Sequence, residues 1–131
     1  MGAGHEHGRI ILNGTSRAIA RLMVDLELDE LKREFLAEAD EKVREIEAKL
    51  VDRSPESVER LSYLAHQLKG SGGSYGFQRI STDAAELESA VERRAHGEAM
   101  DEKIRQHAAN LRSEIDRRLR ELSAPARAAG G

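Results

Sequence analysis

His66 is the residue of this sequence whose type and position point most directly to chemistry. It lies within a run from Leu61 to Tyr75 that has leucines at helical spacing. At about 100° per residue, the leucines of this run share one face, and His66 points about 180° away from them. The leucines in question are Leu61, Leu64 and Leu68. A water-facing imidazole near neutral pH can act as a nucleophile or carry a proton.

The neighbours of His66 on the predicted helix leave the ring beside one cation and little else. Lys69 and Gly70 lie one turn further along, and Gly73 lies two turns further. Each glycine inside a helix costs about 1 kcal/mol relative to alanine. A sequence that accepts this cost beside a histidine indicates that something large approaches the ring.

The rest of the sequence predicts helices and no strands. Charged residues make up 34% of the chain with both signs mixed, as on the solvated faces of amphipathic helices. There is no alternating apolar run and no Asn-Gly turn of the kind that marks strands and hairpins. We therefore expect an all-α fold, an antiparallel up-and-down four-helix bundle with a short extra N-terminal helix.

Caps and apolar spacing set the boundaries that we expect. Asp29 is the predicted N-cap of the first long helix, and Ser54 with Pro55 begins the second. The four long helices are expected over about residues 29–50, 55–74, 78–94 and 101–122. The predicted domain organisation is a flexible N-terminal segment (1–14), one bundle domain (15–122) and a flexible C-terminal tail (123–131). The apolar stripe of the short helix is Ile19, Leu22, Met23 and Leu26, and that of the first long helix is Leu31, Phe35, Ala39, Val43, Ile46 and Leu50.

The composition excludes several classes of function. A net charge of −3 and an aromatic content of 3% argue against a nucleic-acid surface. The absence of cysteine excludes disulfides and thiolate metal sites. No apolar run approaches the roughly 18 residues of a membrane helix, and the N-terminus lacks the features of a signal peptide. We expect a cytoplasmic protein that binds neither nucleic acid nor membranes.

The segment from His66 to Phe77 resembles the motif of the histidine-containing phosphotransfer (HPt) domain family. That motif is His, any residue, an aliphatic residue, Lys, Gly and then small residues, and here it reads HQLKGSGGSYGF. The match continues without a gap to Glu88, and the helical pattern extends it over about residues 28–122. The resemblance implies phosphorelay: a histidine accepts a phosphoryl group from the aspartate of one receiver domain and passes it to another.

The resemblance also implies roles for individual residues. His66 is the expected phosphoacceptor, and Lys69 is a cation for the phosphoryl oxygens. Glu88 is the candidate acceptor for the Nδ1–H group of His66, which leaves Nε2 free to attack. Gly70 and Gly73 are expected to give the receiver steric access to the ring. Exposed residues predicted to contact the receiver are Glu59, Ser62, Gln67, Ser74 and Leu36.

The expected partners are receiver domains of response regulators and a hybrid histidine kinase. No metal site or cofactor is predicted in this chain, since the receiver should supply Mg²⁺. There is no Gly-rich loop followed by Lys-Ser or Lys-Thr, so we expect a phosphocarrier without kinase activity of its own. Four helices from one chain need no second copy to close a core, and a monomer is expected.

Two alternatives stay open at this point. One is an interaction-only bundle that binds a receiver or a kinase without phosphotransfer. The other is the phosphoacceptor domain of a chemotaxis-type histidine kinase, which Phe35-Leu36-Ala37-Glu38-Ala39 also resembles. The sequence names neither the cognate receivers, nor the direction of phosphate flow, nor the output of the pathway. It leaves open whether residues 1–14 are native and whether the chain is free-standing or part of a larger kinase.

Overall fold

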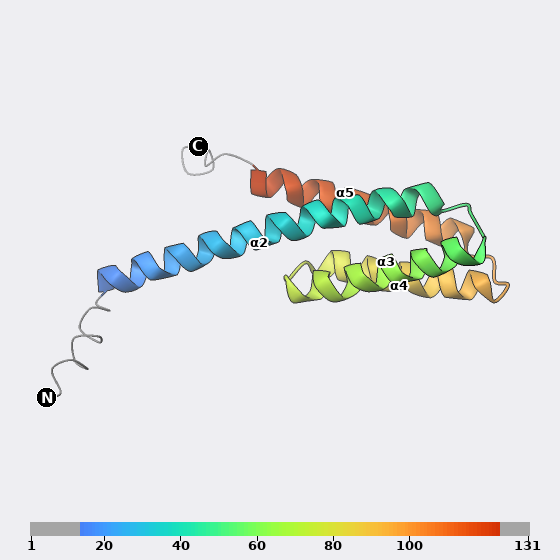
Figure 1. Cartoon of the computed structure of the whole chain (residues 1–131), viewed down its shortest axis with the longest axis horizontal. Helices are drawn as coiled ribbons and strands as arrows, with labels where there is room; N and C mark the ends of the chain where they lie inside the picture. The colour runs from blue at the N-terminus through green and yellow to red at the C-terminus, as the bar shows by residue number, and fades with distance from the viewer. Residues whose placement is uncertain (1–13, 124–131) are drawn as a thin grey trace, which may run out of the picture. The chain divides into compact units, whose positions relative to one another are not determined.

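A computed structural model describes residues 14–123 of the chain. These residues form four α-helices and no strand, which confirms the all-α class. The last three helices agree with the predicted ranges to within about one residue. The helices are α2 (Gly14–Lys49), α3 (Pro55–Ser74), α4 (Gln78–Ala95) and α5 (Asp101–Ser123) (Figure 1).

The first helix differs from the prediction. Residues 14–49 form one helix, so the expected short helix that ends before Asp29 is wrong. The stretch Leu26 to Leu31 contains neither glycine nor proline, and nothing in it ends a helix. Asp29 lies inside α2 and caps nothing. The predicted flexible ends lie outside the described residues, apart from Gly14 and Ser123, which are helical.

Contacts divide the chain into two units, residues 1–32 and residues 33–131. In the second unit, α3, α4, α5 and the part of α2 from residue 33 onward form a helical bundle around one apolar core (Figure 1). Every helix contributes side chains that water does not reach. Those less than 2% exposed include Val43, Ile46, Leu61, Leu64, Leu68, Ile80, Leu87, Val91, Ile104, Leu111 and Ile115. Burial of each contributes about 1.5–3 kcal/mol.

Polar contacts between helices surround this core. Arg60 of α3 donates to Glu45 of α2 at 2.6 Å. Arg112 of α5 binds Asp40 and Glu47 of α2. These contacts tie α2 to α3 and to α5, so each terminal helix of the bundle is held by charge as well as by apolar packing.

Two residues of α2 face differently from the prediction. Leu36 was expected at the surface, but it is fully buried. Leu31 was expected on the core stripe, but it is 45% exposed. On a helical projection the two lie on opposite flanks of the predicted stripe. Leu36 lies within the bundle, where the helices packed against α2 cover this flank of the stripe, whereas Leu31 precedes residue 33, at which the bundle unit begins.

The turn between α3 and α4 positions the histidine helix against its neighbour. Gly76 has φ +82°, a left-handed conformation that favours glycine. The amide of Phe77 donates to the carbonyl of Gly72 at 2.7 Å, and the amide of Gly76 donates to Gly73. This is the Schellman arrangement that ends many helices. Phe35 stacks on Tyr75 and Phe77, with ring centroids 5.3 and 5.5 Å away, and closes this end of the bundle.

Gly72 and Gly73 give a matched test of how closely α3 approaches α4. A Cβ at Gly72 would lie 3.1 Å from the amide nitrogen of Ser81, which the first turn of α4 holds in place. A Cβ at Gly73 would meet only the Ser81 hydroxyl, at 3.5 Å. We expect Gly72→Ala to destabilise the fold by about 1–2 kcal/mol through overpacking, and Gly73→Ala to stabilise it by up to about 1 kcal/mol through helix propensity. Urea unfolding measures both; equal midpoints would contradict the close approach.

Acid should weaken the contact between α2 and α3. Hydrogen bonds from Arg60 lower the pKa of Glu45 from 4.5 to about 2. Because the folded state lowers this pKa, the contribution to stability is complete above about pH 4.5 and is lost as the pH falls toward 2. We expect Arg60→Gln to lose less stability over this range than the wild type, as measured by urea unfolding at a series of pH values. Parallel losses in both proteins would contradict this.

Candidate functional site

His66 lies on the outer face of α3, as the sequence predicts. The hydroxyl of Ser54 accepts a hydrogen bond from the amide of Ser57, and Pro55 occupies the first turn, so the predicted start of this helix is confirmed. Leu64, Ala65 and Leu68 around His66 are buried, which fixes the rotation of the helix. The side chain of His66 is 67% exposed. The core therefore holds the backbone, and water reaches the ring.

Glu88 of α4 binds one nitrogen of this ring. Its Oε2 atom lies 3.1 Å from Nδ1 of His66, and its side chain is 26% exposed. A carboxylate can only accept a hydrogen bond, so the contact requires Nδ1 to carry the proton. The lone pair of the neutral ring then sits on Nε2. The predicted pairing of Glu88 with His66 is present in the structure.

Lys69 lies beside the same carboxylate. Its Nζ atom is 3.9 Å from Oε1 of Glu88, and its side chain is 47% exposed. The carbonyl of Lys69 accepts a hydrogen bond from the hydroxyl of Ser81 at 2.8 Å, which pins this turn of α3 to α4. One carboxylate thus lies against both the histidine and the lysine, and about half of the lysine side chain is exposed to water.

The two glycines near His66 differ in their surroundings. Gly70 is exposed, and a Cβ there would have no atom within 4 Å. Gly73 is also exposed, and its only close neighbour would be the Ser81 hydroxyl. Neither glycine is required by packing against α4, in contrast to Gly72. The space beside the ring is open on this side.

The predicted contact residues around His66 fall into three groups. Glu59 and Ser74 are exposed, and Ser62 and Gln67 are half-buried. Leu36 does not belong to this surface, since it lies in the core.

An aromatic side chain completes the surface beside His66, and the predicted contact residues did not include it. Tyr63 is 50% exposed, three residues before the histidine. Its hydroxyl accepts a hydrogen bond from Gln67 at 2.7 Å, and the guanidinium of Arg60 lies 5.4 Å from its ring centroid. The spacing of three residues was the available signal, because residues three and four apart share a helix face.

The other histidines of the described region have local partners. Nδ1 of His96 lies 2.9 Å from the carbonyl oxygen of Glu92. Nδ1 of His107 lies 3.1 Å from Asp83, and that residue is half-buried. Within residues 14–123, no group of three or more potential ligands could hold a metal ion. Among the same residues, no helix has the length and apolar character needed to cross a membrane.

Comparison with known proteins identifies the family. A family model described as the Hpt domain matches residues 30–124, and the chain belongs to this family. Hpt domains take part in histidine phosphotransfer within phosphorelays, where they interact with receiver domains and kinases. Searches of curated proteins and of solved structures found no match.

The contact between Glu88 and His66 makes a prediction about the state of the ring. In the Glu88→Ala variant the preference for a proton on Nδ1 is lost, and the form with the proton on Nε2 should increase. ¹⁵N NMR of the imidazole measures this change, with Glu86→Ala as the control on the same helix. We also expect phosphotransfer to slow by about 2- to 10-fold, the equivalent of one hydrogen bond of about 0.5–1.5 kcal/mol. Unchanged ¹⁵N shifts would show that the carboxylate does not set the tautomer.

Proposed function

We propose that the protein is a phosphocarrier in which His66 accepts a phosphoryl group from a receiver aspartate and passes it to the aspartate of another receiver. The observation that carries this proposal is an imidazole that is 67% exposed, with Nδ1 held by Glu88 at 3.1 Å. A side chain in this state presents Nε2 to a partner. We expect no kinase activity from the chain itself, because an Hpt domain of this kind receives its phosphoryl group from a partner protein.

The transfer step balances without any further reactant. Nε2 attacks the phosphorus of the acyl phosphate, the bond between phosphorus and the aspartyl oxygen breaks, and the receiver recovers its carboxylate. The ring keeps its proton on Nδ1, so it becomes cationic while the phosphoryl group is bound. Glu88 then faces a positive ring, which stabilises the phosphorylated state. Attack by the second receiver's carboxylate reverses these events.

Lys69 and the open space beside the ring serve this step by charge and by access. Phosphoryl transfer depends on positioning and on charge stabilisation of the oxygens. Lys69 supplies a mobile cation on the face of His66, and the receiver supplies the Mg²⁺. Gly70 and Gly73 leave room for the receiver to bring its aspartate into line with Nε2. The proposed docking rim around His66 consists of Glu59, Ser62, Gln67 and Ser74. Tyr63 also belongs to this rim, whereas Leu36 lies in the core and does not.

We also propose that the bundle is antiparallel and up-and-down. Two pairs of contacts support this direction. His66 meets Glu88 near the middle of α3 and α4, and Gly72 meets Ser81 near the turn. Arg112 meets Asp40, while Arg33 meets the carbonyl of Leu122. Between α3 and α4, and between α2 and α5, the contact that comes later in one helix comes earlier in the other. This is the order expected for antiparallel helices.

Incubation with ³²P-labelled phospho-receivers and Mg²⁺ tests the function. We expect a label on the wild type that is stable in alkali and lost in acid, and mass spectrometry should place it on His66. Binding of several receivers without any label would support an interaction-only bundle in place of the carrier. A label that appears only with a chemotaxis-type kinase as donor, and never with a receiver, would support the phosphoacceptor domain of such a kinase.

A further inference from the structure

Tyr63 lies between two hollows on the surface of the bundle, which together we call the Tyr63 groove. The first hollow lies between α2 and α3 and extends to Gln67, the residue that follows His66. The second extends along α3 toward its N-terminus. Arg60 and Tyr63 line both hollows. The other charged residues that line the groove are Glu38, Glu41, Lys42 and Glu45 in the first hollow and Glu56 and Glu59 in the second.

The ring of Tyr63 is held in place before any partner binds. Its hydroxyl accepts a hydrogen bond from Nε2 of Gln67 at 2.7 Å, and the guanidinium of Arg60 lies 5.4 Å from the ring centroid. Arg60 is fixed in turn by two hydrogen bonds to Glu45 of α2, at 2.6 and 3.0 Å. Tyr63 is nevertheless 50% exposed. A rigid, exposed aromatic side chain loses little freedom when it enters a partner's pocket, and such residues carry much of the binding energy of protein interfaces.

Tyr63 lies on the side of His66 that faces away from Glu88. Because Glu88 of α4 binds Nδ1 and the two nitrogens lie on different sides of an imidazole, Nε2 turns away from Glu88. On a helical projection of α3, Tyr63 and Lys69 lie on opposite sides of His66. Lys69 is the one that lies next to Glu88. A partner that reaches Nε2 from the side away from Glu88 therefore covers Tyr63.

The charges of the Tyr63 groove are mostly acidic. Glu45 is bound by Arg60 and is the exception. Four exposed carboxylates of the groove take part in none of the ion pairs found among residues 14–123, namely Glu38, Glu41, Glu56 and Glu59. Lys42 is the remaining cation among the described lining residues. On α5, in contrast, Arg112 binds three carboxylates. The groove therefore presents an excess of negative charge to a partner.

We propose that the receiver which exchanges phosphoryl groups with His66 docks over the Tyr63 groove, with a pocket for the tyrosine ring and cationic side chains against the four carboxylates. This partner assignment rests on the function proposed for His66. The groove and the histidine belong to one unit, and Gln67 joins them. The negative charge repels nucleic acids and anionic lipids. It also repels receivers with an acidic face, so the groove selects among receivers.

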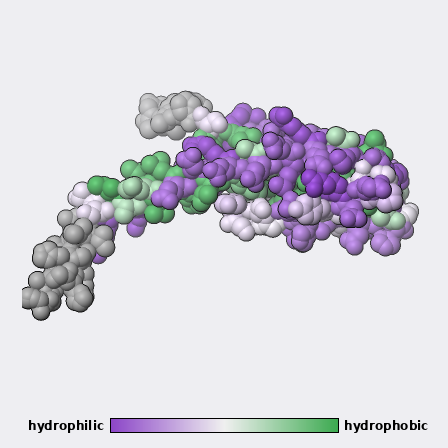
Figure 2. All heavy atoms as spheres, viewed as in Figure 1, coloured by the Kyte–Doolittle hydropathy of each residue, from purple (hydrophilic) through white to green (hydrophobic). Residues whose placement is uncertain are grey.

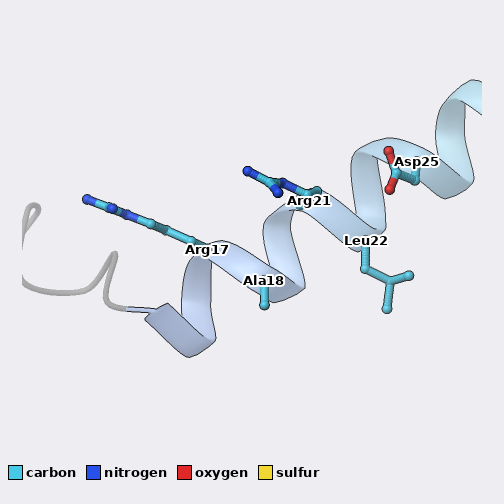
Figure 3. Close-up of a pocket in the computed structure, with 5 residues that line it drawn as sticks. All are labelled: Arg17, Ala18, Arg21, Leu22 and Asp25. Atoms are coloured by element: carbon cyan, nitrogen blue, oxygen red, sulfur yellow. The ribbon is translucent and has the colours of Figure 1, made fainter.

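The start of α2 is a second exposed surface, and it offers no such evidence for a partner. Hydrophobic colouring gathers there, whereas the bundle is mostly polar in the same view (Figure 2). Arg17, Arg21 and Asp25 lie along one side of the helix, and Ala18 and Leu22 lie on the other (Figure 3). The charged groups thus lie away from the apolar ones, and nothing in the structure shows what covers the apolar side.

Transfer from purified phospho-receivers at a series of concentrations tests the role of Tyr63. The probes are the receiver domains encoded in the same genome. We expect Tyr63→Ala to raise the receiver concentration that gives half-maximal transfer by about 10- to 30-fold, as at interface hot spots. The rate at saturation should stay unchanged, because Tyr63 contacts the receiver and not the reacting atoms. Circular dichroism and urea unfolding check that the variant keeps the fold of the wild type.

Salt tests the role of the carboxylates. The half-saturating concentration of the wild type should rise with salt, because salt screens the opposite charges of the two surfaces. A double variant, Glu41→Lys with Glu59→Lys, should need about 5- to 10-fold more receiver at low salt, and its salt dependence should be much smaller. Glu102→Lys is the matched control. It reverses a side chain that is 83% exposed on α5 and should behave as the wild type does.

Three results would overturn the docking surface and leave the function of His66 untouched. They are an unchanged half-saturating concentration in Tyr63→Ala, a wild type that does not respond to salt, and a Glu102→Lys protein as impaired as the double variant. Binding of unphosphorylated receivers to His66→Gln, with and without Tyr63→Ala, separates the two proposals. If receivers bind, Tyr63→Ala weakens the binding and no receiver labels the wild type, the groove stands and the phosphotransfer does not. If no receiver binds or labels the wild type, both proposals are overturned.

Discussion

His66→Gln should lose its phosphoryl label down to background, whatever phospho-receiver is offered. Glutamine keeps a polar side chain of similar size but has no ring nitrogen with a free lone pair. The exposed position means that the substitution leaves the core intact, so the variant should unfold at the same urea concentration as the wild type. Receiver binding should persist, because the rim around the histidine is unchanged.

The matched control for this variant is His96→Gln, at an exposed histidine whose Nδ1 lies near a main-chain carbonyl oxygen. It should be labelled at the wild-type rate. Label on His66→Gln at a rate near that of the wild type would show that another residue is the acceptor. In that case the contact between Glu88 and His66 would be a structural ion pair and nothing more.

Gly70→Gln should slow phosphotransfer by about 10- to 100-fold, the cost expected when reacting atoms are held about 1 Å too far apart. The added side chain stands one turn from His66 on the same face and occupies the space through which a receiver approaches. A Cβ at this position meets no atom within 4 Å, and glutamine favours a helix more than glycine does. Stability should therefore rise by up to about 1 kcal/mol while transfer falls.

Opposite changes in stability and in rate separate a steric block from unfolding. Ala109→Gln places a glutamine on an exposed position of α5 and should leave the transfer rate unchanged. Gly70→Ala should have an intermediate rate, because its side chain is smaller. A Gly70→Gln protein with the wild-type rate would remove the steric role of this glycine, and one with lowered stability would contradict the open space around it.

Much of the site could be predicted from local sequence. Ser54 and Pro55 define the start of α3, and leucines at helical spacing set which face is buried, so the outward direction of His66 follows from the pattern alone. The same spacing places Lys69 and Gly70 beside the ring. Glu88 was found by resemblance to a family motif. Its contact with His66 depends on how α4 lies against α3, which no local pattern specifies.

The sequence by itself determined the all-helical class, the three later helices and the exposure of the histidine, because periodicity and capping act within a few residues. Tertiary structure decided what depends on neighbouring helices. It buried Leu36, which lies on a flank of the predicted α2 stripe, and it brought Ser81 against the carbonyl of Lys69. Helical periodicity marks the centre of a buried face, and only the shape of the packed core decides how far that face extends to either side.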